Sequence, residues 1–157
     1  DGDLLVTPAP IPLHQRIAGN LYAELRQHVR KHRLGEVLIA PVDVVFTTST
    51  VLEPDIVFVS RPRLHIIGAK NLSGPPDLVV EVLSESSQRL AREIKPKQYA
   101  QHGVPEFWRI DPEARTVEVF RLKEGAYELE ASLGFGDALT SPLFPGLNLP
   151  VASLWES

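Results

Sequence analysis

The chain has 157 residues, of which 43% are hydrophobic and 23% charged, with a formal net charge of −4 and no cysteine. That length and composition suit one folded domain over residues 1–157 and exclude disordered and collagen-like chains. Without cysteine there are no disulfides, zinc–thiolate sites, iron–sulfur clusters or cysteine nucleophiles. The apolar runs are too short to cross a membrane and no secretory leader is recognisable, so we expect a cytoplasmic protein without a membrane partner.

Charge is distributed unevenly along the chain. The first 105 residues carry 12 Lys/Arg and 11 Asp/Glu, whereas residues 106–137 carry 4 and 8. The negative total disfavours a protein that coats nucleic acid, but a local basic face within the first two thirds stays open. No glycine-rich phosphate loop, serine-nucleophile elbow or H-E-x-x-H motif occurs, which disfavours the enzyme classes built on them.

The hydrophobic pattern predicts a short strand and then a long helix. Residues 4–6 suit a strand that ends in a proline-rich turn. From Leu13, apolar residues recur at every fourth position, which predicts an amphipathic helix over residues 13–32 with a C-cap at Gly35. The polar side of this helix and its end carry five cations against Glu24 alone: Arg16, Arg26, Arg30, Lys31 and Arg33.

Strands and a second helix are predicted to follow. Residues 37–46 suit a strand that continues past Pro41, residues 56–59 another, and residues 77–83 a buried central strand, with a loop at 60–76. A second helix is expected over about residues 87–102, and Pro96 inside it predicts a kink or a restart.

The rest of the chain completes an α/β fold. Strand-like runs at 106–110, 116–122 and 126–131, joined by short turns, indicate a β-meander. The tail beyond residue 134 supplies apolar residues that pack against the body. The order of elements predicts a mixed central sheet flanked by two main helices, with the meander toward the C-terminus.

Two carboxylates stand at unusual places in the predicted strands. Glu81 lies in the middle of the apolar run 77–83, on the same face as Asp77, and Asp55 opens the run 56–59. A buried carboxylate without a partner costs several kcal/mol, so Glu81 needs a cation, a partner base or an opening to solvent. A place at a sheet edge or an arginine partner would satisfy it equally well.

Two carboxylates with a lysine nearby suit metal-assisted phosphodiester chemistry. Mg²⁺ prefers carboxylate oxygens, keeps several waters and adds phosphate oxygens of a substrate. A lysine can orient or deprotonate the attacking water and offset charge on the phosphoryl group. Lys95, on the second predicted helix, follows Glu81 at such a position.

Seven short segments form a recognisable series: DGDLLV (1–6), HQRI (14–17), EPD (53–55), PDLVVEVLS (76–84), REIK (92–95), GVPEFW (103–108) and DP (111–112). In their order and spacing, these segments resemble the Uma-two family of bacterial restriction-endonuclease-like proteins, within the PD-(D/E)XK nuclease superfamily. The resemblance runs over nearly the whole chain and implies a restriction-endonuclease-like core.

The resemblance also implies roles for individual residues. Asp55 and Glu81 match the family's metal ligands. The motif lysine normally stands two residues after the glutamate, where this chain has a leucine. The family places its lysine on the following helix, four residues before a tyrosine, and counting back from Tyr99 gives Lys95, with Lys97 as the substitute candidate.

Auxiliary residues match family positions as well, each with a structural alternative. Asp3 would be an outer metal ligand or a solvated terminal aspartate. His14 would touch a phosphate or the metal's water shell, or cap its helix. Asp77 is expected first to fix the entry of its strand by accepting backbone hydrogen bonds. Phe107 and Trp108 are expected in the core.

The sequence therefore predicts an endonuclease, dependent on Mg²⁺ or Mn²⁺, that hydrolyses phosphodiester bonds of DNA without an organic cofactor. The superfamily resemblance also implies a homodimer. Two alternatives stay open: a catalytically inactive nucleic-acid-binding module and a protein-interaction module on the same fold. The cations of the first helix, with Arg61, Arg63 and Lys70, form either a phosphate track or a solvated surface.

Overall fold

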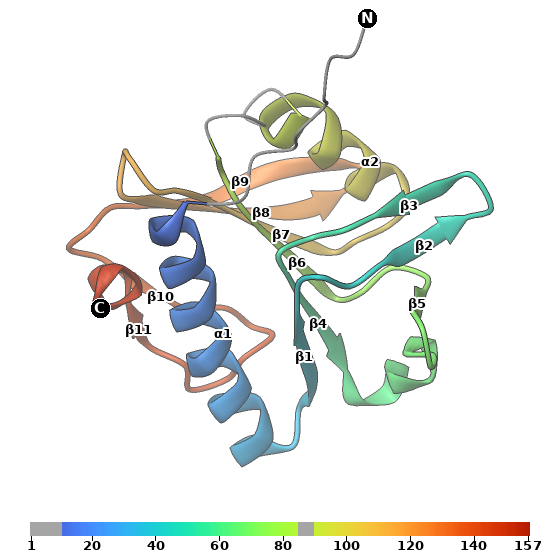
Figure 1. Ribbon diagram of the computed structural model, residues 1–157, viewed down its shortest axis with the longest axis horizontal. Coiled ribbons are helices and arrows are strands. Elements are labelled where there is room, and N and C mark those ends of the chain that lie inside the picture. Colours follow the sequence, from blue (N-terminus) through green and yellow to red (C-terminus); the bar gives the residue numbers. More distant parts are fainter. Residues whose placement is uncertain (1–10, 85–89) are drawn as a thin grey trace, which may run out of the picture.

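The computed structural model describes residues 11–84 and 90–157, which form a mixed sheet with a helix on each face (Figure 1). The strand predicted over residues 4–6 and the candidate ligand Asp3 lie outside these described residues. Among the described residues, no helix is long and apolar enough to span a membrane.

A six-stranded sheet forms the centre of the fold. Its strands stand in the order β1 (Gly35–Ile39), β4 (Ile56–Ser60), β6 (Leu78–Val82), β7 (Glu106–Asp111), β8 (Thr116–Lys123) and β9 (Ala126–Leu133). Neighbouring strands run antiparallel except β6 and β7, which are parallel. The prediction of a mixed sheet is confirmed, and the predicted meander is β7–β9.

Smaller elements surround this sheet. A second sheet has the order β3 (Thr50–Leu52), β2 (Val44–Thr47) and β5 (Leu72–Ser73), and β10 (Ala138–Leu139) pairs with β11 (Leu149–Pro150). Two 3₁₀ helices, η1 (Arg61–Ile66) and η4 (Val151–Trp155), complete the set. Elements of two or three residues are too short to show a hydrophobic period, so the sequence did not predict them.

Helix α1 (Pro12–His32) confirms the first predicted helix, but not its C-cap. Arg33 takes the left-handed conformation at the helix end, with φ 54°, and its N–H bonds back to the last turn. Gly35 instead opens β1, where a Cβ would collide with the carbonyl oxygen of Val59. Glycine is thus required here by the close approach of β1 and β4, and not by the helix end.

The single strand predicted over residues 37–46 is wrong. β1 ends at Ile39, and β2 begins at Val44 in the other sheet. Ala40 and Pro41 lie between them, joined by a cis peptide bond. Proline has no N–H to continue a ladder of hydrogen bonds, so the chain leaves the main sheet at this point.

The second predicted helix is confirmed together with its restart. A π-helical turn, η3 (Leu90–Ile94), leads into α2 (Lys95–Gln101), whose first turn holds Pro96. Proline offers no N–H to the carbonyl four residues earlier. That carbonyl, of Arg92, accepts a hydrogen bond from Nη1 of Arg109 at 3.3 Å instead. Residues 87–89 of the predicted helix lie outside the described residues.

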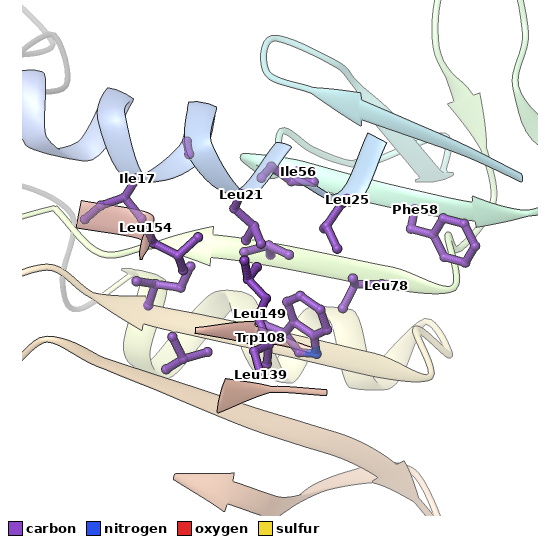
Figure 2. Packing of buried hydrophobic residues seen from close by; sticks show 14 of the residues in the cluster. Ile17, Leu21, Leu25, Ile56, Phe58, Leu78, Trp108, Leu139, Leu149 and Leu154 are labelled. Atoms are coloured by element: carbon purple, nitrogen blue, oxygen red, sulfur yellow. The ribbon is translucent and has the colours of Figure 1, made fainter. Parts of the chain in front are cut away.

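Alternation along β6 divides the core into two clusters. Leu78, Val80 and Val82 lie in the cluster under α1, whereas Val79 lies with Tyr99 in the cluster on the α2 side. Figure 2 shows the α1 side, where the helix, the sheet and the C-terminal tail interdigitate. Phe107 and Trp108 are fully buried on opposite faces, as predicted.

Leu21→Ala is expected to lower the free energy of unfolding by roughly 2–5 kcal/mol, because it opens a cavity in the cluster under α1. Leu21 has no exposed surface. Urea unfolding followed by circular dichroism measures the change. Leu64→Ala is the matched control, since Leu64 is 37% exposed. Its loss is expected to be about 1 kcal/mol or less. Equal losses in the two variants would contradict this packing.

Candidate active site

Four element ends meet where the inner strands β4 and β6 of the main sheet begin and end, respectively. Ile56 of β4 stands opposite Val80 of β6 in antiparallel register. Extending this register by one residue brings Asp55, just before β4, beside Glu81 of β6. The first turns of α1 and α2 reach these strand ends, because His14 contacts Asp55 and Lys95 contacts Glu81. The tertiary structure thus brings together Asp55, Glu81, Lys95 and His14 from the predicted set.

Glu81 is held by two side chains of α2. It is 3% exposed. Its Oε2 accepts a hydrogen bond from the Tyr99 hydroxyl at 2.5 Å and lies 3.3 Å from Nζ of Lys95. Lys95 and Tyr99 are four residues apart, so they share one face of the helix. The cation that a mid-strand carboxylate needs therefore comes from α2 and not from position 83.

Asp55 is held by β6 and by α1. Its Oδ2 accepts the N–H of Val82 at 2.7 Å and lies 3.5 Å from Nε2 of His14. The same His14 nitrogen lies 3.1 Å from the carbonyl oxygen of Val82. His14 is 8% exposed, so its imidazole is part of the buried wall of the site.

The electrostatics of the site disfavour the ionisation of both carboxylates when no further cation is present. The pKa of Glu81 is raised to about 7, first of all by burial and also by the charge of Asp55, although Lys95 and the Tyr99 hydroxyl act in the opposite direction. The hydrogen bond with Asp55 raises the pKa of His14. Burial raises the pKa of Tyr99, so its hydroxyl stays protonated and donates to Glu81. A further positive charge between the carboxylates would relieve their repulsion.

The two carboxylates fit a hard divalent cation. Among the described residues, Oδ1 of Asp55 and Oε1 of Glu81 accept no hydrogen bond, while the other oxygen of each is fixed by the contacts above. Such orientation by outer partners is typical of metal ligands. Within residues 11–84 and 90–157, no group of three or more His, Asp or Glu is placed to hold a metal. The protein would thus supply a partial set, which suits Mg²⁺ because this ion retains waters and phosphate oxygens.

Of the two candidate lysines, Lys95 is the one that reaches the carboxylates. Lys97 is exposed and lies on the other side of α2. There it lines an open pocket of about 690 Å³ together with residues of β7, β8 and β9. Two residues along an α-helix correspond to a rotation of about 200°, so the side chains of the two lysines point to different sides of α2.

Asp77 lies at the opposite end of β6 from this site. Its Oδ2 accepts the N–H of Ser60 at 2.6 Å and lies 3.3 Å from Nη1 of Arg63. It therefore ties the start of β6 to the end of β4, which is the structural use expected for it. The pairing also takes Arg63 out of the set of unpaired surface cations.

Sequence reasoning missed the direct part that Tyr99 plays. The tyrosine served only as a landmark for counting back to the lysine, whereas its hydroxyl is the shortest contact of Glu81. The signal was present in the four-residue spacing of Lys95 and Tyr99, which puts both side chains on the helix face that turns toward β6.

The same architecture occurs in a solved structure. A crystal structure described as that of "a putative nuclease belonging to DUF820 from Anabaena variabilis ATCC 29413" matches with a TM-score of 0.77 and 20% identity, over 99% of this chain and 87% of that chain. At this identity the match shows the fold.

The family is given by a sequence model. The model of Uma2, described as "Putative restriction endonuclease", matches residues 1–152. The chain therefore belongs to the Uma2 family of restriction-endonuclease-like nucleases, which confirms the resemblance carried by its motifs. No curated protein matches the chain.

The raised pKa of Glu81 predicts a pH-dependent stability. Between pH 4.5, the ordinary pKa of a glutamate, and about pH 7, the folded protein keeps the proton on Glu81. In that interval the folded state binds more protons than the unfolded state, so the free energy of unfolding falls as pH rises. Glu81→Gln removes the titration and nearly preserves the shape. The stability of this variant relative to the wild type is expected to rise by about 2 kcal/mol from pH 5 to pH 7.

Urea unfolding at pH 5, 6 and 7, with EDTA present, measures this difference. Glu128→Gln is the matched control, because Glu128 is 58% exposed. Its difference from the wild type is expected to stay constant over the same interval. A constant difference for Glu81→Gln as well would show that burial does not raise this pKa.

Proposed function

We propose that this protein is a divalent-metal-dependent endonuclease that hydrolyses phosphodiester bonds of DNA. The observation that carries the proposal is the pair of carboxylates formed by the half-buried Asp55 and the buried Glu81, with Nζ of Lys95 3.3 Å from Glu81. Carboxylates that can hold a metal ion, with a lysine and an imidazole beside them, suit phosphodiester hydrolysis with a metal. Membership of a family described as restriction endonucleases supports the same reaction class.

Each residue has a definite task in this proposal. Asp55 and Glu81 would hold Mg²⁺ or Mn²⁺ through their free oxygens. When bound, such an ion polarises the phosphate and lowers the pKa of water. Lys95 orients the attacking water and offsets the charge that develops on the phosphoryl group. Tyr99 keeps Glu81 in place, and His14 offers its raised-pKa imidazole to Asp55 and to a phosphate beside it. A homodimer would supply two such sites, one for each strand of the duplex.

A non-catalytic nucleic-acid-binding module is the second candidate. It is favoured by one observation: the described residues offer two carboxylates and no three-residue metal cluster. In a metal-dependent catalyst, substrate and water must supply the remaining ligands of the metal. A binding module does not need a complete metal site. The two candidates differ in whether DNA is cut when a metal is present.

Asp55→Ala and Glu81→Ala are each expected to weaken Mn²⁺ binding at least tenfold, because each removes one of two carboxylate ligands. Isothermal titration calorimetry, with and without a short DNA duplex, measures the affinity. Glu128→Ala removes an exposed carboxylate far from the site and is expected to bind as the wild type does. Wild-type affinity in both site variants would show that the metal binds elsewhere.

Lys95→Ala is expected to slow DNA cleavage by roughly 10²–10⁴-fold while leaving Mn²⁺ binding in place, because the lysine acts on water and phosphate. Nicking of a supercoiled plasmid with Mg²⁺ or Mn²⁺ measures the rate, with EDTA as the blank. Lys97→Ala is the matched control and is expected to cleave within about twofold of the wild type, since Lys97 points away from Glu81. Equal cleavage by the two lysine variants contradicts the assignment.

A further inference from the structure

The outward side of α1 carries cations that the proposed active site does not use. Arg16, Arg26 and Arg30 are exposed, and helical geometry puts them within an arc of about 80° on the side away from the sheet. We call these three residues the arginine row. Among residues 11–84 and 90–157, none of them forms an ion pair with a carboxylate.

No ion pair with a carboxylate of the described residues explains the arginine row, although Arg30, in the last turn of α1, is favoured by the helix dipole. Arg26 and Arg30 are four residues apart, so their like charges repel each other along the helix surface. Most other arginines of the described chain are paired; for example, Arg92 pairs with Asp111 and Arg109 with Glu118. A helix face that gathers unpaired guanidinium groups is a candidate for binding an anion.

Small residues fill the gap between Arg16 and Arg26. Gly19 and Ala23 lie on the same arc. Among the residues that the structure describes, nothing lies within 4 Å of a Cβ built at Gly19, so their packing does not require glycine there. Glycine inside a helix is less stable than alanine. A partner whose atoms come close to the helix backbone accounts for a glycine that the fold itself does not need.

A shallow hollow follows Gly19 along this surface. Tyr22, Ala23, Arg26, Gln27 and Arg30 line an open pocket of about 420 Å³. Ala23 keeps it open, and the polar side chains around it are hydrogen-bond donors. Two guanidinium groups beside a phenol and an amide form a donor set that suits phosphate oxygens.

We propose that the arginine row binds the phosphate backbone of double-stranded DNA. From Arg16 to Arg30 the helix rises about 21 Å. Duplex DNA carries one negative charge about every 1.7 Å of helix axis, both strands counted, so a row of cations about 21 Å long lies opposite several phosphates. A mononucleotide offers phosphate at one point only, and it leaves most of the row unused.

The position of α1 connects this surface to the candidate active site. His14 contacts Asp55 from the first turn of the helix, and Arg16 follows two residues later on the outward side. DNA held along the row therefore runs past the helix end at which the carboxylates lie. This inference rests on the proposed function, since it takes the DNA substrate from that proposal and adds the surface that holds it.

Binding of a fluorescent DNA duplex of about 20 base pairs, or two helical turns, tests the proposal. Fluorescence anisotropy in EDTA, at roughly 50 to 200 mM salt, gives Kd and its salt dependence without cleavage. Arg26→Gln combined with Arg30→Gln is expected to weaken binding at least tenfold. It should also reduce the slope of log Kd against log salt by about 2, as for the loss of two phosphate contacts.

The matched control removes the same charge elsewhere. Lys31→Gln combined with Lys123→Gln takes one cation from another side of α1 and one from β8, both of them exposed. This double variant is expected to bind within about threefold of the wild type, with its salt slope nearly unchanged. Equal weakening in the two double variants shows a general charge effect and overturns the proposal, as does wild-type binding by the arginine variant.

Gly19→Leu tests the close approach without changing charge. The substitution favours the helix, so the thermal midpoint is expected to stay or rise. DNA binding is expected to weaken at least fivefold, because the new side chain fills the gap between the arginines. A variant that keeps its thermal midpoint and binds DNA as the wild type does overturns the close approach at this position.

The outcomes separate this inference from the proposed nuclease activity. If the wild type binds duplex DNA through the arginine row and never cleaves it, the nuclease proposal is wrong and the proposal of DNA binding by the row is supported. If the wild type cleaves DNA and the arginine variants bind and cleave it equally well, the nuclease proposal is supported. The proposal that the arginine row binds DNA is then wrong. Single-stranded DNA or RNA of equal length bound as tightly as the duplex overturns the assignment to double-stranded DNA.

Discussion

A carboxylate buried in the central strand is the constraint on which the rest of the site depends. Glu81 is nearly inaccessible in β6, among branched aliphatic side chains. An ionised group in that place must be paired and hydrogen-bonded, because its loss of hydration is large. α2 supplies both needs through Lys95 and Tyr99, so the helix is fixed over the sheet by polar contacts as well as by apolar packing.

A second buried glutamate shows what a purely structural carboxylate looks like in the same protein. Glu106 of β7 accepts hydrogen bonds from Trp108 and Ser141 on one oxygen and from Arg121 on the other. It joins the sheet to the C-terminal tail, and both its oxygens are used. Among the described residues, nothing donates a hydrogen bond to Oε1 of Glu81, which lies beside a second carboxylate, and burial raises the pKa of Glu81. The contacts of Glu106 thus hold the fold together, whereas in the proposed function the remaining oxygen of Glu81 binds the metal.

The two helices cover opposite faces of the sheet, and each carries different side chains to the site. α1 covers one face with a buried stripe and carries His14 to the site, while its outward side carries the arginine row, which forms no ion pair among the described residues. α2 covers the other face and carries the lysine and the tyrosine. A site assembled from both sides of a sheet is held rigidly, because neither helix can move without breaking its own apolar contacts.

Local patterns made much of this fold predictable. The four-residue period of α1, the β-branched run of β6 and the turn-punctuated meander β7–β9 are all patterns within a few neighbouring residues, and all three are confirmed. The exchange of sheets after Ile39 and the role of Gly35 were not predictable in this way. Both depend on which strand lies alongside β1, and that is a property of the assembled sheet.

The same division holds for the candidate site. The sequence by itself determined the mixed α/β class, the family and the residues with suitable chemistry, because mid-strand carboxylates conflict with their apolar neighbours and so stand out. Only the tertiary structure decided that Lys95 and not Lys97 faces Glu81, and that Asp77 ties two strands together. It also decided that His14 reaches Val82 across 68 residues of chain. Strand register and helix placement fix such contacts, and no pattern local to the sequence contains them.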